Sequence, residues 1–199
     1  MVGHDRIESD VRVLLVPGGG GSGPQHWHTY WQSADGRAET VVQAEWNGGT
    51  RAQWVAALDR HVRSSNRPTV LIPHSLGNIV VSHWAATATD TGTVYGALLV
   101  APADIDADWA QPGSLYRAFR PIPMKLLPFP TVLVASTNDP YLSMSRARDF
   151  AAAWGSRLEV VGPLGHIGSD AKLETWEAGQ RLLDEIIRCY APVPHRPSE

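Results

Sequence analysis

The sequence has little cysteine and no long apolar run. Its 199 residues contain one cysteine, Cys189, which cannot form a disulfide within the chain. This scarcity favours a reduced, cytoplasmic protein over a secreted domain built on disulfides. No apolar stretch approaches the roughly 20 residues that cross a bilayer, and residues 1–10 lack the apolar core of a signal peptide. We therefore expect neither a membrane span nor secretion.

An excess of either charge is also missing. The chain has 17 lysines and arginines against 20 aspartates and glutamates, a formal net charge of −3, and no long run of like charge. This balance predicts neither nucleic acid nor a membrane surface as a partner. Hydrophobic residues make up 43% of the chain, which is enough for a sizeable core. We expect one domain over residues 1–190 and a flexible, proline-rich tail at 191–199.

Apolar runs alternate with helical patterns along the chain. Short, mostly apolar runs predict six strands, at 11–16, 40–44, 69–72, 94–100, 131–136 and 157–161. Apolar residues at spacings of three and four, together with capping residues, predict helices at 51–63, 78–87, 143–154 and 173–190. Buried strands that alternate with helices are typical of an α/β protein with a parallel sheet.

The segment with the strongest chemical pattern is Pro73-His74-Ser75-Leu76-Gly77, between the third strand and the next helix. A serine at such a junction is typical of a nucleophile elbow, a tight turn that pushes the hydroxyl out of the sheet. Gly77 fits the crowding between helix and strand, whereas Pro73 departs from the small residue expected at the first position. A chance Ser-x-Gly is the alternative, and the strand before it and helix after it favour a nucleophile at Ser75.

A serine nucleophile needs a base and a carboxylate that orients the base. In this kind of fold the order along the chain is serine, acid, histidine. Asp139 follows the fifth strand, and His166 follows the sixth in a glycine-rich loop. Alone, Asp139 could be a turn former and His166 an exposed loop histidine. Because all three residue types follow strands in the required order, we predict a triad of Ser75, His166 and Asp139.

Four consecutive glycines, at 18–21, follow the first strand. An oxyanion hole needs one backbone N–H from the residue after the nucleophile and another from a neighbouring strand's loop. We predict Leu76 and Gly19 as these donors, with Gly20 next in line and close to the substrate. The spacing Gly18-x-Gly20-x-x-Gly23 also matches a dinucleotide-binding pattern, but no Gly-Lys-Ser/Thr follows, which excludes a P-loop.

The connection at 101–130 is long and holds six prolines. Loops of this length in a compact domain are usually functional or mobile. Trp109 in this segment, together with Trp27 and Trp31, is a candidate wall for an acyl pocket. His74, inside the elbow, is also assigned to the substrate site. We expect it to be a structural hydrogen-bonding group, and a role as a second base is the alternative.

Two further patterns could indicate a metal. The Asp-x-Asp-x-Asp pattern at 104–108 resembles the start of a calcium loop, but Leu115 stands where a bidentate glutamate is needed. We interpret these carboxylates as solvated, with Asp104 at the mouth of the site as the alternative. His26 and His28 offer two ligands without a third. We predict no metal and no cofactor.

Four segments of the chain resemble the retinoblastoma-binding protein 9-like serine hydrolases: residues 13–31 (VLLVPGGGGSGPQHWHTYW), the elbow at 73–77, residues 135–141 (ASTNDPY) and Gly165-His166. The resemblance spans nearly the whole chain. It implies a compact α/β-hydrolase with a six-stranded, mainly parallel sheet in the order 2-1-3-4-5-6, helices on both faces and no large lid. It also implies the same triad and no cofactor.

One property of that family does not carry over. The retinoblastoma-binding sequence of the founding member, Leu-x-Cys-x-Glu, is missing here, since Cys189 lies between Arg188 and Tyr190. We therefore do not expect that protein partner.

Together these patterns predict hydrolysis of a small carboxylic ester, or of an amide or thioester, through an acyl-enzyme. The expected partner is a small-molecule acyl substrate. Two alternatives use the same scaffold: a binding module with little turnover, and an acyltransferase in which another nucleophile replaces water.

Overall fold

The computed structural model describes residues 10–111 and 113–190, so the tail predicted at 191–199 lies outside the described residues. Six strands form one sheet in the order β2-β1-β3-β4-β5-β6, and every neighbouring pair is parallel. This confirms the order that the resemblance implied. The strands are β1 (Arg12–Val16), β2 (Ala38–Thr40), β3 (Thr69–Pro73), β4 (Val94–Val100), β5 (Thr131–Ser136) and β6 (Arg157–Val161).

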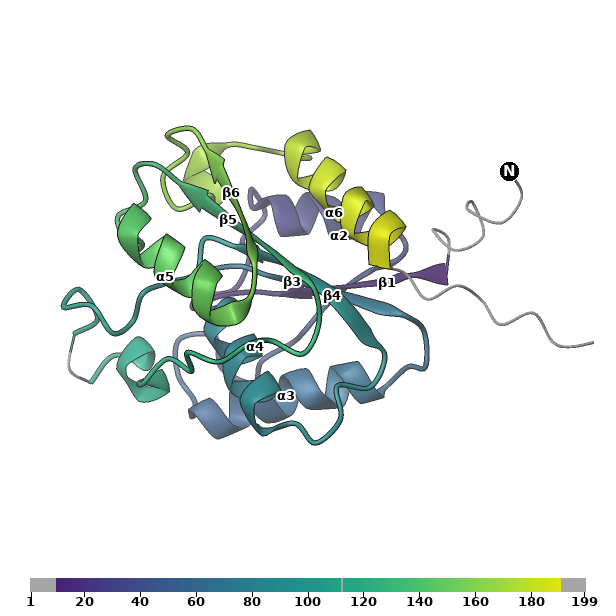
Figure 1. The fold of residues 1–199 in the computed structure, drawn as a ribbon, viewed down its shortest axis with the longest axis horizontal. Coiled ribbons are helices and arrows are strands. Elements are labelled where there is room, and N and C mark those ends of the chain that lie inside the picture. The colour runs from purple at the N-terminus through teal and green to yellow at the C-terminus, as the bar shows by residue number, and fades with distance from the viewer. Residues whose placement is uncertain (1–9, 112, 191–199) are drawn as a thin grey trace, which may run out of the picture.

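Helices cover both faces of the sheet (Figure 1). The helices are α2 (Trp27–Ala34), α3 (Arg51–Arg63), α4 (Leu76–Thr87), α5 (Met144–Trp154) and α6 (Glu177–Tyr190). One apolar core lies between the sheet and α3, α4 and α5, and a second lies between the sheet and α2 and α6. Alternate residues of β1 enter the two cores: Leu14 lies in the first, and Val13 and Leu15 lie in the second.

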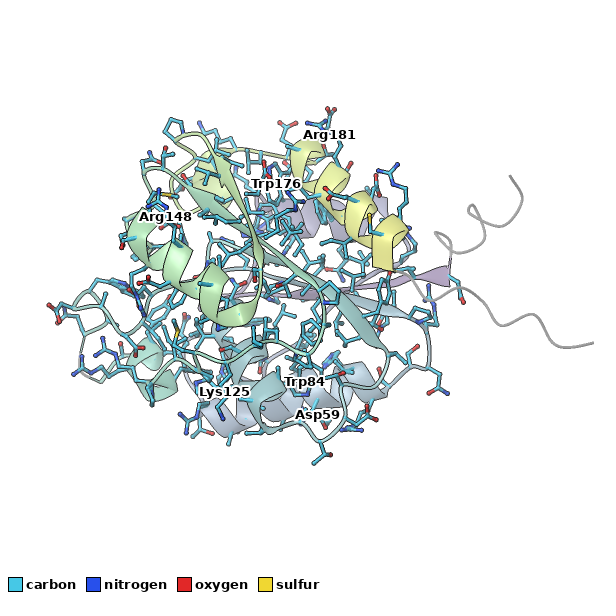
Figure 2. All side chains as sticks on the ribbon, in the orientation of Figure 1. Asp59, Trp84, Lys125, Arg148, Trp176 and Arg181 are labelled. Atoms are coloured by element: carbon cyan, nitrogen blue, oxygen red, sulfur yellow. The ribbon has the colours of Figure 1, made fainter. Side chains whose placement is uncertain are left out.

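Specific side-chain contacts join the elements within both cores. In the first core, the indole N–H of Trp84 on α4 donates to the Asp59 carboxylate on α3 over 3.0 Å (Figure 2). In the second, Trp176 packs its ring against Trp27 and Trp31 of α2. Both helix layers are therefore held to their neighbours by specific contacts as well as by apolar burial.

Capping residues explain where two helices begin and end. Thr50 and Gln53 form a reciprocal capping box at the start of α3. Ser143 accepts from the N–H of Arg146 at the start of α5, and Gly155 ends that helix in the left-handed conformation with φ of 71°. The Ser143 and Gly155 caps confirm the predicted bounds of α5.

Several predicted bounds were wrong. The second strand is Ala38–Thr40 and not 40–44, since β1 pairs with Ala38 through Thr40 and Val42 is 60% exposed. The helix after the elbow begins at Leu76, and the last helix begins at Glu177 rather than at 173. The helix α2 was not among the predicted elements.

The parallel sheet determines where the loops meet. The segments after β1, β3, β5 and β6 all leave the carboxyl edge of the sheet, which is where ligands bind in such sheets. The glycine run, Ser75, Asp139 and His166 follow these four strands, so the fold gathers them at one edge. No helix in the described ranges is long and apolar enough to cross a membrane.

Candidate active site

Ser75 lies in a strained turn between β3 and α4. Its backbone has φ of 56° and ψ of −123°, a conformation that residues with a side chain rarely adopt. The turn is held on both sides. The N–H of Ser75 donates to Val100 O over 3.1 Å, and the side-chain amide of Asn78 donates to the carbonyls of Ser75 and Val100. A serine in a strained turn held between a strand and a helix has the geometry of a nucleophile elbow.

Two glycines allow the elbow to approach β1. A Cβ on Gly77 would lie 2.1 Å from the carbonyl oxygen of Val16, and a Cβ on Gly18 would lie 2.8 Å from the Cβ of Ser75. Neither position has room for a side chain. The expected crowding at Gly77 is therefore present, and Pro73 is accommodated as the last residue of β3.

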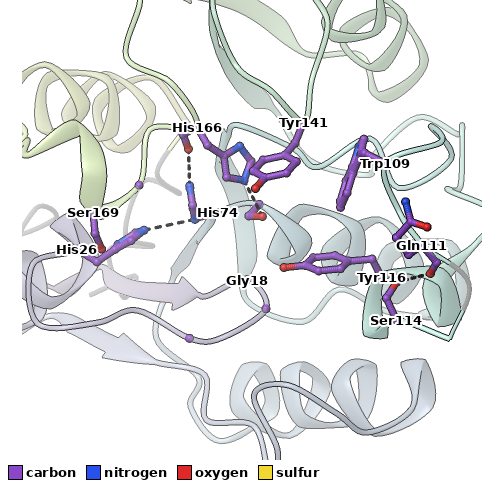
Figure 3. Close-up of a pocket in the computed structure, with 14 residues that line it drawn as sticks. Gly18, His26, His74, Trp109, Gln111, Ser114, Tyr116, Tyr141, His166 and Ser169 are labelled. Carbon is purple, nitrogen blue, oxygen red and sulfur yellow. Dashed lines mark hydrogen bonds between the residues drawn. The ribbon is translucent and has the colours of Figure 1, made fainter.

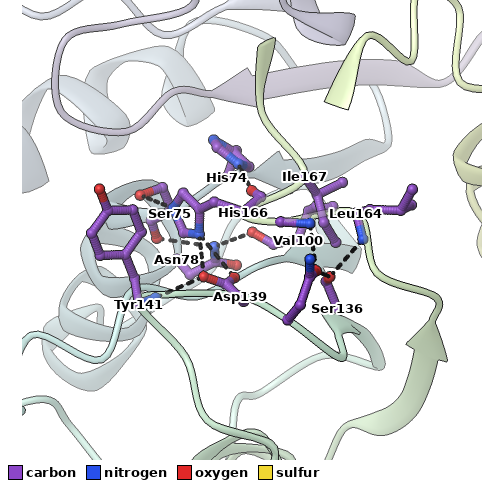
Figure 4. Close-up of polar contacts among 12 residues, drawn as sticks. His74, Ser75, Asn78, Val100, Ser136, Asp139, Tyr141, Leu164, His166 and Ile167 are labelled. Atoms are coloured by element: carbon purple, nitrogen blue, oxygen red, sulfur yellow. Dashed lines mark hydrogen bonds and ion pairs between the residues drawn. The ribbon is translucent and has the colours of Figure 1, made fainter. Parts of the chain in front are cut away.

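Ser75, His166 and Asp139 form one hydrogen-bonded line (Figure 4). The Nε2 atom of His166 lies 2.8 Å from the Ser75 Oγ, and its Nδ1 atom lies 2.9 Å from an Asp139 carboxylate oxygen. The Asp139 side chain is fully buried and also accepts from the N–H of Tyr141. Because the carboxylate accepts from Nδ1–H, Nε2 is left to accept the serine proton.

Two residues to which the sequence assigned no role, Asn138 and Ser136, hold the loops of Asp139 and His166 together. The Asn138 side-chain oxygen accepts from the N–H of Gly165 over 2.7 Å, and the Ser136 Oγ accepts from the N–H of Leu164 over 3.0 Å. Ser136 also donates to Asn138. These bonds cross from the end of β5 to the loop after β6, so they set the approach of His166 to Asp139. In the sequence, the only local indication of this positioning role was that Asn138 is next to Asp139.

Two backbone N–H groups beside Ser75 have no hydrogen-bond partner in the described part of the chain. They belong to Leu76, the first residue of α4, and to Gly19 in the loop after β1. The N–H of Gly20, by contrast, donates to Trp46 O over 2.9 Å. Gly20 is therefore occupied by a structural bond, which leaves Leu76 and Gly19 as candidate donors to an oxyanion.

A chain of neutral histidines lies beside Ser75 and His166. His74 Nε2–H donates to the backbone carbonyl of His166 over 2.8 Å, and His74 Nδ1 lies 3.3 Å from His26 Nε2 (Figure 3). His26 Nδ1 in turn accepts from the N–H of His28 at the start of α2. Each ring nitrogen of His74 and His26 has a compatible role when both imidazoles are neutral.

Burial keeps these imidazoles neutral. Desolvation lowers the pKa of His26 to about 4, with a smaller effect from His166. It also lowers the pKa values of His28 and His74 well below 6.5. His74 thus lines the site as a neutral hydrogen-bonding group that fixes the backbone of His166. Among the described residues, no group of three or more His, Cys, Asp or Glu side chains is arranged to hold a metal ion.

A cavity of about 480 Å³ opens at Ser75 (Figure 3). Aromatic rings form one side: Trp109 packs edge-on against Tyr116 at 5.2 Å, and Tyr141 packs against Trp109 and His166. No permanently charged side chain occurs among the described residues that line the cavity. The lining is Gly18, Gly19, Gly21, His26, His74, Ser75, Trp109, Gln111, Ser114, Tyr116, Tyr141, His166, Gly168 and Ser169.

Some of the predicted pocket residues lie elsewhere. Trp109 and His74 line the cavity, but Gly20, Trp27 and Trp31 do not belong to its lining. Trp27 is 1% exposed and donates its indole N–H to Ile167 O over 2.8 Å, because the α2–α6 core takes up its ring. Tyr116 and Tyr141 take the place of these tryptophans as walls.

The interpretation of Asp104 as a solvated carboxylate was wrong. Its side chain is 8% exposed and forms an ion pair of 2.9 Å with Arg146 on α5. The partner is 42 residues further along the chain, so no local pattern could reveal it. Asp104 is not part of the cavity lining.

Comparison with known proteins assigns the family. A family model described as serine hydrolase matches residues 13–185. No curated protein matches the chain. Among solved structures, a protein described as a YdeN-like hydrolase from Pectobacterium atrosepticum is 30% identical, with a TM-score of 0.83 over 96% of this chain and 98% of that one.

More distant structures share the fold alone. The ydeN gene product of B. subtilis is 16% identical, with a TM-score of 0.65 over 89% of this chain and 98% of that one. Est1E of Butyrivibrio proteoclasticus, with ferulic acid bound, is 12% identical, with a TM-score of 0.65 over 89% of each chain. From the family match and the 30% identical neighbour, we conclude that this chain belongs to the serine hydrolase family, with the α/β-hydrolase fold and YdeN-like relatives.

Proposed function

We propose that this chain is a carboxylesterase that cleaves small, uncharged esters through an acyl-enzyme on Ser75. The observation that carries the proposal is the line from Asp139 to His166 to Ser75, with contacts of 2.9 Å and 2.8 Å at the floor of a cavity. Serine, base and acid in this arrangement have the recurring geometry of serine hydrolases.

Acylation uses all three residues. The Ser75 Oγ forms a bond to the ester carbonyl carbon while its proton passes to His166 Nε2, and the carbonyl π electrons move onto oxygen. The N–H groups of Leu76 and Gly19 stabilise that oxyanion. When the carbonyl re-forms, the carbon–oxygen bond to the leaving group breaks, and His166 returns the proton to the departing alcohol. Asp139 keeps the imidazole oriented and stabilises its charged form.

Deacylation repeats these steps with water. His166 takes a proton from a water molecule whose oxygen bonds to the acyl carbon. The second oxyanion collapses, the bond to Ser75 Oγ breaks, and His166 protonates the serine. Acid and intact enzyme are released.

The cavity supports a small and uncharged substrate. Its volume of about 480 Å³ is at the lower part of the usual range for small-molecule sites. Its wall of Trp109, Tyr116 and Tyr141 offers apolar faces with phenol groups, and it offers no arginine or lysine for an anionic substrate among the described lining residues. Burying a charged acyl group there would cost free energy without a compensating partner.

Turnover of p-nitrophenyl acetate tests the proposal. Ser75→Ala should reduce kcat by a factor on the order of 10⁶, with an unchanged melting temperature. Ser33→Ala is the matched control, since the Ser33 hydroxyl lies on the exposed side of α2 and donates to the Thr29 carbonyl. Turnover by Ser75→Ala at the wild-type rate would refute the nucleophile.

The same assay separates the alternatives. A wild-type protein that binds the ester without releasing p-nitrophenol would be a binding module. Release that depends on an added alcohol or amine, with transfer of the acetyl group to it, would indicate an acyltransferase. Release in buffer alone, with acetate as the product, supports the esterase.

A further inference from the structure

The hydroxyl of Tyr116 lies against the glycine loop after β1. A Cβ built on Gly19 would be 2.7 Å from the Tyr116 oxygen, so the phenol occupies the space that a side chain at Gly19 would need. The neighbouring residue, Gly18, packs in the same way against the Cβ of Ser75. In Figure 3, the Tyr116 phenol group points from the aromatic side of the cavity toward Gly18 and the middle of the cavity.

The Tyr116 ring is fixed in place by its packing and by the anchored helix that carries it. Tyr116 belongs to the short 3-10 helix η1 (Leu115–Phe119) and packs edge-on against Trp109. At the end of η1, Phe119 is fully buried against Trp54, and the Phe119 carbonyl lies 2.7 Å from His83 Nε2 on α4. The hydroxyl is therefore presented by a rotamer and a backbone that are both restrained, which is what a preorganised donor requires.

The hydroxyl has no hydrogen-bond partner among the described residues, although Tyr116 is half-buried and lines the cavity. A phenol group in such a position carries a free donor toward whatever enters. Burial raises the pKa of Tyr116 above its usual value of 10.0, so the group keeps its proton across the range in which a histidine base works.

We propose that the Tyr116 hydroxyl is a third hydrogen-bond donor to the acyl carbonyl oxygen as it becomes an oxyanion, beside the N–H groups of Gly19 and Leu76. The proposal rests on the esterase function proposed above. Tyr116 packs on the segment that supplies the Gly19 donor, whereas Tyr141 packs on the His166 ring at 4.8 Å. Tyr116 is therefore the phenol beside the Gly19 donor, whereas Tyr141 is the phenol beside the proposed base.

Tyr116→Phe tests this, because it removes only the oxygen. A hydrogen bond to a charged group contributes more than one between neutral groups, and single oxyanion donors contribute about 10²-fold or more. We expect kcat for aryl acetates to fall by about 10- to 100-fold, with KM changed by less than about twofold. The melting temperature should stay unchanged, since the hydroxyl has no partner in the fold. Tyr30→Phe, on α2 and outside the cavity lining, is the matched control and should keep wild-type kinetics.

A sulfur substitution distinguishes an oxyanion donor from a packing role. A thiocarbonyl sulfur accepts hydrogen bonds weakly, so the wild-type enzyme should prefer an aryl acetate over the matched aryl thionoacetate. Tyr116→Phe should reduce that preference by about tenfold. An unchanged preference, a pure rise in KM, or a loss that follows Tyr141→Phe instead would overturn the proposal. If Ser75→Ala also kept its turnover, the proposed acyl-enzyme mechanism on Ser75 would itself fail, whereas loss of turnover in Ser75→Ala confines the failure to the role of Tyr116.

Discussion

Replacing Gly77 by alanine tests how closely α4 must approach β1. The added Cβ would lie 2.1 Å from Val16 O, 3.0 Å from Val16 C and 3.1 Å from Pro17 O. All three are backbone atoms, so no side chain can rotate away to make room. A carbon and a carbonyl oxygen normally stay about 3.3 Å apart, and α4 must therefore shift by about 1 Å.

That shift has two consequences that can be measured separately. Overpacking of this size costs about 1–3 kcal/mol, and moving Val16 O also weakens its bond with the N–H of His74, now 3.0 Å long. We expect the free energy of unfolding to fall by about 3 kcal/mol. Because Ser75 and Leu76 move with the helix, kcat/KM should fall by about 10²-fold in the protein that remains folded.

The assay measures chemical denaturation and ester turnover on the same samples of the wild-type protein and of Gly77→Ala. Gly36→Ala is the matched control, since its Cβ would meet nothing within 4 Å. That variant should be neutral or slightly more stable, because alanine reduces the entropy of the unfolded chain. Wild-type stability and wild-type turnover in Gly77→Ala would refute the close contact between elbow and strand.

Two further predictions concern the histidines and their carboxylate. Asp139→Asn should lower kcat by about 10⁴ with little loss of stability, because the amide favours the wrong His166 tautomer; a loss under tenfold would contradict the role of Asp139. Burial lowers the pKa of His26 from 6.5 to about 4. Between these pH values the unfolded chain binds a proton at His26 that the folded protein excludes. The free energy of unfolding should therefore fall as the pH drops from about 6.5 toward 4. In urea titrations, His26→Asn, which keeps a capping side chain, should reduce the loss between pH 7.5 and 4.5 by roughly 2 kcal/mol; an equal loss in both proteins would contradict this.

The elbow could be predicted because its constraints are local. A turn that leaves a buried strand and starts a helix needs a glycine where the two touch, and a Cβ on Gly77 would lie only 2.1 Å from the Val16 carbonyl oxygen of β1. Ser75 adopts its strained φ of 56° at the same turn. Asp139 and His166 could be placed beside it because parallel strands deliver the residues that follow them to one edge of the sheet. Their contacts of 2.8–3.0 Å come from folding, and no pattern predicts them.

Burial of the second strand could not be judged from local hydrophobicity. Residues 40–44 contain two consecutive valines, yet Val41 is buried and Val42 is 60% exposed. The ladder with β1 instead begins at Ala38, whose partner is Val13. The edge of a sheet has neighbours on one side only, so a β-branched run there does not define the paired residues.

The cavity walls depended on long-range packing. Trp27 was a reasonable wall by sequence, but its ring packs against Trp31 and Trp176 in the α2–α6 core. Tyr116 enters the cavity from the connection after β4, where prolines removed any periodic pattern. Only the return of that connection across the carboxyl edge of the sheet brings its aromatic rings to Ser75.

The most direct measurement of the central claim is covalent labelling by a fluorophosphonate, followed by mass spectrometry of the intact protein and of its peptides. A serine activated by His166 attacks phosphorus and displaces fluoride, so we predict one adduct per chain, located on Ser75, and none in Ser75→Ala. A folded wild-type protein that stays unlabelled, or an adduct on any other serine, would contradict the account.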